Sequence, residues 1–306
     1  MTEMPSYPGV RIDNVTISGP HGEIPARTYR PPEPAAAVAG FVWVHGGAFI
    51  GGDLDMPEAE WVGRVLASRG IAVVSLDYRQ AVEGTTVPVP SDDVLAGWLW
   101  AVDHVADLGV TLTQLHLGGA SAGGNLAASV SLRCRDGAGP LPASLVLVYP
   151  DLHAELPAPS RELAAVLEAE TEGRIKSDLA YRIALNYVGD EARFDEPYAF
   201  PASGSLPGLP PTFILNAEAD DLRASGEDFA ELLRAAHVPV RVEFEPGSRH
   251  GYLNDWLDQQ GQLSIDRIVD WLEIRRHGGG RGREHAAGML AADPEIAQAV
   301  RVVIEP

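Results

Sequence analysis

Cysteine is almost absent from the sequence, and its scarcity excludes two kinds of structural support. Cys134 is the single cysteine, so the chain has neither an internal disulfide nor a metal site built from several cysteines. It falls in the apolar helical stretch 126–135, where a thiol is typically buried and unreactive. A protein that does not depend on disulfides is expected in the cytoplasm.

Long apolar runs are also missing. No stretch approaches the roughly 18 uninterrupted apolar residues that a membrane-spanning helix requires. Residues 1–11 include Pro5 and Pro8 and have neither a basic start nor an apolar centre, unlike a secretory signal peptide. We therefore expect no membrane span and a cytoplasmic location.

Basic residues are scarce beside acidic ones. The chain has 23 lysines and arginines against 43 aspartates and glutamates, which gives a formal net charge of −20. A field of this sign repels nucleic acid and anionic membrane surfaces, so neither is an expected partner. With 45% hydrophobic and 22% charged residues, the chain can bury a large core of ordinary globular composition.

Hydrophobic periodicity predicts strands that alternate with helices. Short apolar runs predict strands at 40–44, 71–76, 115–117, 144–149, 212–216 and 240–244. Helical periodicity predicts helices at 57–68, 94–105, 122–135, 224–236 and 264–275. Residues 15–18 and 24–29 flank a glycine-containing turn and predict a β-hairpin. The alternation is typical of an α/β fold whose mostly parallel sheet is covered by helices on both faces.

One internal segment departs from this alternation. Residues 152–201 lack a strand pattern and contain two helix-like stretches, 160–170 and 177–188. A segment of this kind between two strands is typical of a lid or cap. We therefore expect a small helical cap inserted into a core formed by 1–151 and 202–276.

The last segment, 277–306, begins with a run of glycines and arginines that is flexible by composition. Beyond it, 293–300 has a helical pattern and 302–304 a strand-like one. We expect a flexible tail. The alternative is an arm that docks on a partner subunit, as in a homodimer.

The most informative motif is Gly-x-Ser-x-Gly at 119–123, centred on Ser121. It directly follows a predicted strand and precedes a predicted helix, which is the context of a nucleophile elbow. So sharp a turn strains the serine backbone, and larger side chains two positions away would collide with it. The helix N-terminus behind it favours developing negative charge. The alternative is a small-residue turn without chemical meaning, which the strand-turn-helix context disfavours.

A second glycine-rich loop, 45–49, follows a predicted buried strand. Consecutive small residues let backbone N–H groups point together at an oxyanion. We expect N–H donors at Gly47, Ala48 and Ala122, with Gly46 as the hinge of this oxyanion hole. The histidine that opens the loop is expected to fix it through a side-chain hydrogen bond rather than to take part in the chemistry.

A nucleophilic serine needs a base and a carboxylate that orients the base. His250 lies in a predicted loop at a strand's carboxyl end, where ligand sites gather. Asp220 follows another predicted strand, which gives the chain order Ser, Asp, His of this fold. We therefore predict a catalytic triad of Ser121, Asp220 and His250, with Asp221 and Glu218 as rivals for the acid.

Several motifs together resemble the hormone-sensitive-lipase-like branch of the α/β hydrolases, the bacterial carboxylesterases with an HGGG loop. HGGAF at 45–49 resembles the HGGGF loop, and GASAGG at 119–124 resembles the GDSAGG elbow. DDLR at 220–223 resembles DPLR, which selects its first aspartate as the acid. RHGY at 249–252 resembles the segment that carries the base. The resemblance covers most of 40–255 and implies an α/β-hydrolase fold and carboxylesterase activity.

The chain also departs from this family pattern. Ala120 stands where the family has aspartate, Ala48 where it has a third glycine, and Asp221 where it has proline. The LAPE core of the family's DYRLAPE segment is missing from 80–83. None of these changes removes a triad member or a backbone donor. Few residues precede the first predicted strand, so we expect an incomplete cap and an open pocket unless the tail or another subunit covers it.

These observations predict hydrolysis of short-chain or small-molecule carboxylic esters through an acyl-enzyme on Ser121. The reaction needs neither a metal nor an organic cofactor. Three alternatives stay open. The same triad could serve an amide or formamide hydrolase, or an acyltransferase that prefers an alcohol to water. The third is a ligand-binding relative without activity, which the intact triad disfavours.

Overall fold

The computed structural model describes residues 3–33, 36–170 and 174–276. In this part of the chain eight strands form one sheet: β1 (Arg11–Gly19), β2 (Gly22–Arg30), β3 (Ala39–Val44), β4 (Ile71–Leu76), β5 (Leu115–Ala120), β6 (Leu145–Val148), β7 (Thr212–Ala219) and β8 (Val240–Arg249). Their spatial order is β1-β2-β4-β3-β5-β6-β7-β8. The pairs β1–β2 and β2–β4 are antiparallel, and the pairs from β4 to β8 are parallel.

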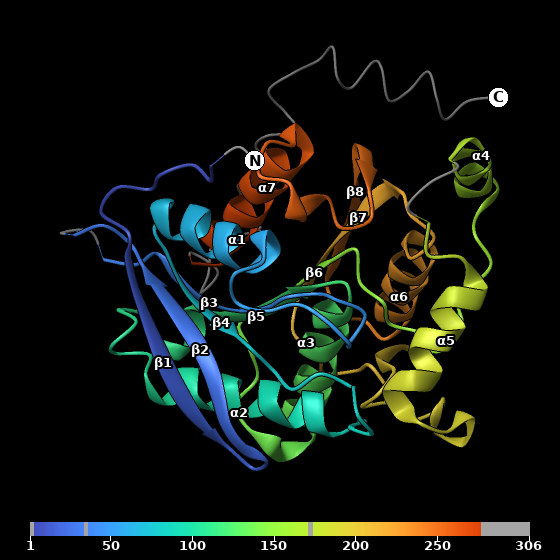
Figure 1. Cartoon of the computed structure of the whole chain (residues 1–306), viewed down its shortest axis with the longest axis horizontal. Coiled ribbons are helices and arrows are strands. Elements are labelled where there is room, and N and C mark those ends of the chain that lie inside the picture. The colour runs from blue at the N-terminus through green and yellow to red at the C-terminus, as the bar shows by residue number, and fades with distance from the viewer. Residues whose placement is uncertain (1–2, 34–35, 171–173, 277–306) are drawn as a thin grey trace.

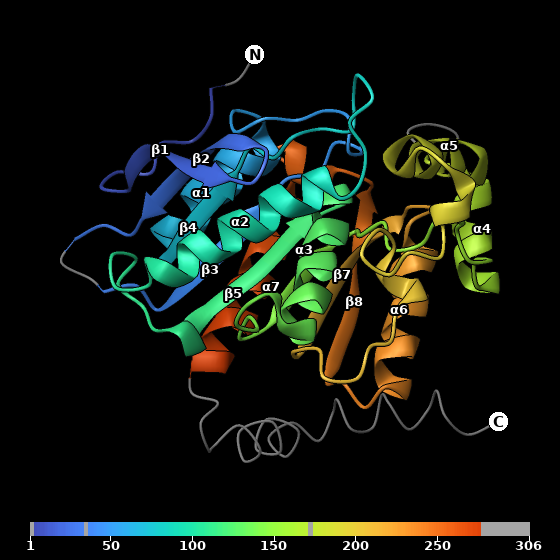
Figure 2. The same ribbon diagram turned by 90° about the horizontal axis from the view of Figure 1, so that it is seen from below.

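Helices cover both faces of the sheet (Figures 1 and 2). α1 (Pro57–Ser68) and α7 (Gln259–Arg276) pack on one face, and α2 (Val89–Asp103), α3 (Ala122–Arg133) and α6 (Arg223–Ala235) on the other. Because both faces are covered, β3, β4, β5 and β6 are buried along their whole length. The mostly parallel sheet with helices on both faces, expected from the sequence, is confirmed.

The strand β8 is longer than the sequence pattern predicts. The predicted end of this strand at 244 is wrong, because β8 continues to Arg249, which pairs with Ala219 beyond a register shift in the β7–β8 pair. Pro246 is tolerated there because it lies where the register of the β7–β8 pair shifts, between the paired residues Glu245 and Arg249, and β8 is an edge strand. His250 therefore follows the end of the strand directly.

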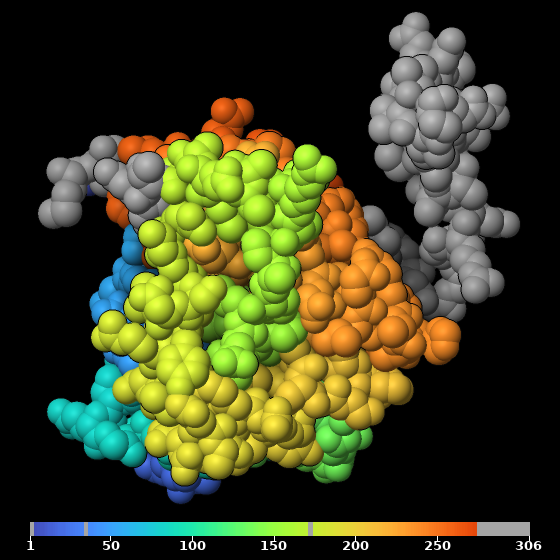
Figure 3. Space-filling view, turned by 90° about the vertical axis from the view of Figure 1, so that its right-hand side faces the viewer, coloured from blue at the N-terminus to red at the C-terminus, as the bar shows by residue number. Residues whose placement is uncertain are grey.

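The segment between β6 and β7, residues 152–201, contains α4 (Arg161–Ala169) and α5 (Ser177–Val188), close to the helices expected there. We call it the β6–β7 insertion. Figure 3 shows it, in yellow-green to yellow, spread over one side of the molecule. Few apolar side chains lie under α4, where Leu163 and Leu167 pack on Ala224. Ion pairs also join the insertion to the core: Arg174–Asp221, Arg223–Glu162 and Arg249–Glu170.

Other expectations concern single segments. Short helical turns complete the described chain: Leu112–Gln114, Cys134–Ala138, Glu191–Arg193, Pro201–Ser203 and Tyr252–Asn254. Burial raises the pKa of the Cys134 thiol to about 11, in agreement with the inert cysteine that we expect. No helix among the described residues is both long and apolar enough to cross a membrane. The expected tail, 277–306, lies outside the described residues.

Candidate active site

Ser121 alone connects β5 to α3. Its backbone has φ 53° and ψ −121°, a conformation that is costly for a residue with a side chain. Its N–H donates to the carbonyl of Val148 over 2.9 Å, which ties the turn to β6. The turn holds the serine at the N-terminal end of α3 in a strained, well-determined position.

Glycine is required on both sides of this serine. A Cβ at Gly119 would lie 2.5 Å from the carbonyl oxygen of Val44, and one at Gly123 would lie 2.1 Å from the same atom. The collision expected from the sequence is therefore confirmed, with the end of β3 as the obstacle. This contact also brings the loop after β3 against Ser121.

The three residues of the predicted triad meet in one hydrogen-bonded chain. Nε2 of His250 lies 3.0 Å from Oγ of Ser121, and its Nδ1–H donates to Oδ2 of Asp220 over 2.7 Å. Asp220 is 1% exposed and also accepts from the N–H of Leu222 over 3.0 Å. The distances suit proton transfer from the serine to the imidazole.

Carboxylates surround the imidazole. Burial acts to lower the pKa of His250, but the charge and hydrogen bond of Asp220 outweigh it, helped by the charges of Glu58 and Asp151. The pKa of His250 therefore lies above its ordinary value of 6.5. Burial also raises the pKa of Asp151 to about 7, against the opposing charge of His250. Asp151 directly follows Pro150, and its N–H donates to the carbonyl of Ser121 over 3.4 Å.

The two rival acids are bound elsewhere. Asp221 forms an ion pair with Arg174, at 2.5 Å between Oδ1 and Nη2. The carboxylate of Glu218 accepts the N–H of Gly247 over 2.6 Å. Asp220 is thus the carboxylate that the structure brings to His250.

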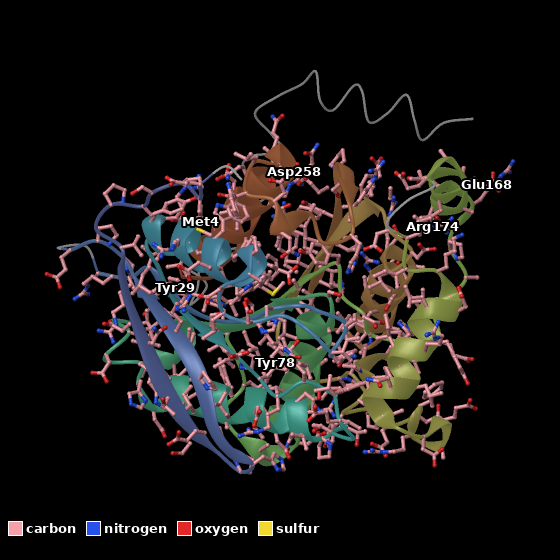
Figure 4. All side chains as sticks on the ribbon, viewed as in Figure 1. Met4, Tyr29, Tyr78, Glu168, Arg174 and Asp258 are labelled. Carbon is pink, nitrogen blue, oxygen red and sulfur yellow. The ribbon has the colours of Figure 1, made fainter. Side chains whose placement is uncertain are left out.

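The predicted oxyanion loop is held on several sides. Nδ1–H of His45 donates to the carbonyl of Gly46 over 2.7 Å, as expected for a histidine that fixes the loop. The hydroxyl of Tyr78, a buried residue labelled in Figure 4, donates to the carbonyl of His45 over 3.1 Å. The N–H of Gly46 donates to Oε2 of Glu58 over 2.5 Å. The N–H of Gly46 is therefore engaged by Glu58 and does not point at an oxyanion. This fits a hinge residue and not an oxyanion donor.

The remaining loop residues have left-handed backbone conformations. Gly47, Ala48 and Phe49 have φ of 114°, 54° and 62°, so the chain turns sharply, and the carbonyl of Gly47 accepts the N–H of Gly51 over 2.9 Å. The Phe49 ring stacks on Tyr187 of α5 at 3.9 Å between centroids. The loop is therefore packed against the β6–β7 insertion as well as the core.

Comparison with known proteins agrees with this geometry. Residues 41–254 match a protein family described as having the alpha/beta hydrolase fold. The chain belongs to this family. The α/β-hydrolase fold predicted from the sequence is thus confirmed.

Similar proteins include several esterases. This α/β hydrolase is 35% identical to carboxylesterase NlhH of Mycobacterium tuberculosis over 249 residues, 81% of this chain and 77% of that protein. A hyperthermophilic esterase from the archaeon Pyrobaculum calidifontis is 31% identical, with a TM-score of 0.77 over 86% of this chain and 85% of that one. An esterase from the bacterial hormone-sensitive lipase family is 25% identical, with a TM-score of 0.75 over 89% and 87%. The resemblance to that branch is confirmed.

The positions at which this α/β hydrolase departs from the pattern of its family make specific contacts in the structure. Ala120 is buried in an apolar cluster with Val146 and Tyr149, so it adds no polar group beside the serine. Asp221 binds Arg174 of the insertion, labelled in Figure 4. In the segment 80–83, the N–H of Ala81 donates to the carbonyl of Phe49 over 2.6 Å. This segment therefore supports the oxyanion loop without the LAPE sequence.

A cavity of about 580 Å³ lies beside the imidazole of this α/β hydrolase. Its lining comes from α4, the ends of β7 and β8, and the residues that follow: Val166, Ala169, Glu170, Glu218, Ala219, Gly247, Arg249, His250, Tyr252 and Asp258. The volume falls in the range of about 300–1,000 Å³ typical of small-molecule pockets. Three carboxylates against one arginine give the lining an acidic balance.

Sequence reasoning missed three residues of this site. Glu58, Tyr149 and Asp151 contact the oxyanion loop, the imidazole or the serine backbone. Position alone could have indicated the last two, because Tyr149 ends the strand predicted at 144–149 and Asp151 lies two residues beyond it. Nothing local distinguishes Glu58 from an ordinary acidic residue in the first turn of a helix. Within the described residues no group of three or more histidines, cysteines or carboxylates could hold a metal ion.

Proposed function

We propose that this α/β hydrolase is a serine carboxylesterase that forms an acyl-enzyme on Ser121. The observation that supports this most is the hydrogen-bonded chain from Ser121 through His250 to Asp220, on a strained strand-to-helix turn. The similarity to proteins named as esterases gives independent support.

The reaction proceeds in two acyl-transfer steps. His250 takes the hydroxyl proton of Ser121 as the oxygen attacks the ester carbonyl, then returns the proton to the leaving alcohol. Water attacks the acyl-enzyme with His250 again as base, which releases the acid and the free serine. Asp220 accepts Nδ1–H of the imidazole and stabilises the imidazolium.

The tetrahedral oxyanion of each step faces backbone donors. We assign these to the N–H groups of Gly47, Ala48 and Ala122, with Gly46 as the hinge. The helix N-terminus at Ala122 adds a favourable dipole. Loss of one such donor in a comparable site costs about 3–4 kcal/mol of transition-state stabilisation.

The β6–β7 insertion serves as the cap of the pocket in this proposal. Its helix α4 lines the cavity beside His250, and α5 packs on the oxyanion loop through Tyr187. We expect short acyl chains or a small ester as substrates. In this proposal the described residues of the segments 1–151 and 202–276 form the core around it.

The test uses chromogenic acetyl, butyryl, octanoyl and dodecanoyl esters with the wild-type chain and Ser121→Ala. We expect turnover of the short esters that vanishes in the variant. Equal activity in both proteins would contradict the assignment of the nucleophile. A matched amide detects an amide hydrolase, and added alcohol with ester product detects an acyltransferase. Tight ligand binding without turnover would favour the inactive relative.

Location and assembly are further parts of the proposal. A cytoplasmic location is supported by the single cysteine. Fractionation of the source cells tests this location. A homodimer is the proposed alternative to a monomer, and sedimentation of the full chain separates the two.

A further inference from the structure

We propose that the buried carboxylate of Glu58, bridged by the hydroxyl of Tyr149, is a positioning group that holds the oxyanion loop in place beside His250. The proposal rests on the serine esterase function proposed above. It assigns to Glu58 a part in the reaction that acts through the loop and the imidazole, without contact to the substrate.

Glu58 joins three segments that are distant in the sequence. Oε2 accepts the N–H of Gly46 over 2.5 Å. Oε1 accepts the hydroxyl of Tyr149 over 2.5 Å and the amide of Asn254 over 3.4 Å. The residue is 1% exposed. One carboxylate thus connects the oxyanion loop, the end of β6 and the segment after His250.

Gly46 is confined between this carboxylate and the nucleophile. A Cβ at Gly46 would lie 2.8 Å from Oε2 of Glu58 and 3.0 Å from Cβ of Ser121. The bond to Glu58 fixes the direction of the peptide that precedes the proposed donors. Without this bond, the N–H of Gly46 has no acceptor. The proposed donors after Gly46 then lose their fixed distance from Ser121.

Tyr149 connects Glu58 to His250, the catalytic base. Its ring meets His250 edge-on at 5.0 Å between centroids, while its hydroxyl donates to Glu58. It is fully buried and has φ 35°, a left-handed conformation that is unfavourable for a tyrosine. Strain of this kind persists where the surroundings impose a position.

The carboxylate of Glu58 makes no ion pair within the described residues 3–33, 36–170 and 174–276. A buried charge held by neutral donors alone is costly. The groups that face His250 are Asp220 from the β7–α6 turn, Asp151 after β6, and Glu58 from α1. When the imidazole gains the serine proton, Glu58 stabilises the positive charge from the side of the oxyanion loop.

Glu60 supplies a matched control on the same helix. It too is buried, but its carboxylate binds the hydroxyl of Tyr29 over 2.5 Å and forms ion pairs with Arg27 and Arg64. These partners lie away from the oxyanion loop. A purely structural role of a buried glutamate in α1 would therefore show equally at both positions.

The experiment compares Glu58→Gln, Glu58→Ala and Glu60→Gln with the wild-type chain. The pKa of His250 is measured by NMR of ¹³C-labelled histidine, assigned with His250→Asn, and kcat and KM are measured on a short ester. The NMR reading does not require turnover, so inactive wild-type protein would refute the proposed function and still leave Glu58 tested.

We expect Glu58→Gln, which removes the charge but keeps an acceptor, to lower the pKa of His250. Glu58→Ala should lower kcat at least about tenfold with KM within about twofold, because an oxyanion hole acts mainly in the transition state. Glu60→Gln should lower thermal stability and leave the pKa of His250 and kcat unchanged. An unmoved pKa in Glu58→Gln, wild-type kcat in a folded Glu58→Ala, or equal effects of Glu60→Gln would overturn the proposal. If Glu58→Ala does not fold, the pKa in Glu58→Gln decides.

Discussion

Single residues set the chemistry of this site. Ser121 occupies a turn that requires glycine two positions before and after it. A side chain at Gly119 or Gly123 would collide with the end of β3. His250 follows the last residue of β8 and reaches both Ser121 and Asp220. The sequence motifs predicted these positions because the steric demands of the elbow are local. Glu58 was missed because its role depends on a contact across the fold.

The pH dependence of the reaction follows from the charges near the imidazole. Neutral His250 is the base, and the charges of Asp220, Glu58 and Asp151 outweigh burial and hold its pKa above 6.5. Activity is therefore lost as pH falls through the raised pKa and present above it. We expect the acid limb of kcat/KM on a short ester to have its midpoint above pH 6.5, as measured from pH 5 to 9. A flat profile over that range would contradict the role of His250.

Ala48 carries backbone strain that the family's glycine would avoid. Its φ is 54°, a conformation that costs an alanine about 1 kcal/mol or more relative to glycine. We expect Ala48→Gly to raise the free energy of unfolding by about 1 kcal/mol, measured by denaturant titration. The matched control, Ala165→Gly in exposed helix α4, should lower it by up to about 1 kcal/mol. Destabilisation in both variants would show that φ at position 48 is not a source of strain.

The elements divide into the sheet with its covering helices and an insertion whose two helices are held differently. Helix α5 packs into the main core, whereas α4 has only a small apolar contact and is joined to the core by ion pairs. The central strands and covering helices were predictable because continuous apolar runs and amphipathic patterns follow from burial. The extension of β8 to Arg249 was not, because Pro246 and Gly247 look like a turn, and a register shift in the β7–β8 pair accommodates them. The ion pairs of the β6–β7 insertion were also unpredictable, since they join residues far apart in the sequence.

The ion pair between Asp221 and Arg174 tests the role of the insertion. Removing its charge should loosen the helix that lines the cavity and leave the reacting groups in place. A partly exposed pair of this kind is worth about 1 kcal/mol or less, so we expect Asp221→Asn to raise KM by up to about fivefold with kcat unchanged. Asp266→Asn, which removes an exposed pair with Arg69, should change neither. Unchanged KM in Asp221→Asn would show that the pair does not hold the pocket.

At the scale of the whole molecule, we expect charge to affect which substrates are favoured. The chain carries a net charge of −20, and the cavity beside His250 is lined by Glu170, Glu218 and Asp258 against Arg249. The negative sign of the net charge was evident from the composition. The acidic balance of the pocket was not, because its residues come from four separate segments that only the fold brings together.

A cationic ester should therefore be favoured through long-range attraction. We expect kcat/KM for acetylthiocholine to fall roughly threefold between about 0.02 M and about 0.5 M salt, because screening shortens the range of the field. The uncharged isostere, S-(3,3-dimethylbutyl) thioacetate, should show no such fall. An equal response of both thioesters would contradict steering by charge.

The most direct test of the account is covalent labelling of the nucleophile with an alkyl fluorophosphonate. The serine oxygen displaces fluoride, and the mass of the adduct is located by peptide mapping. We expect one adduct per chain, on the peptide that contains Ser121, absent in Ser121→Ala and formed much more slowly in His250→Ala. Labelling of another residue, or undiminished labelling in Ser121→Ala, would contradict a nucleophilic Ser121.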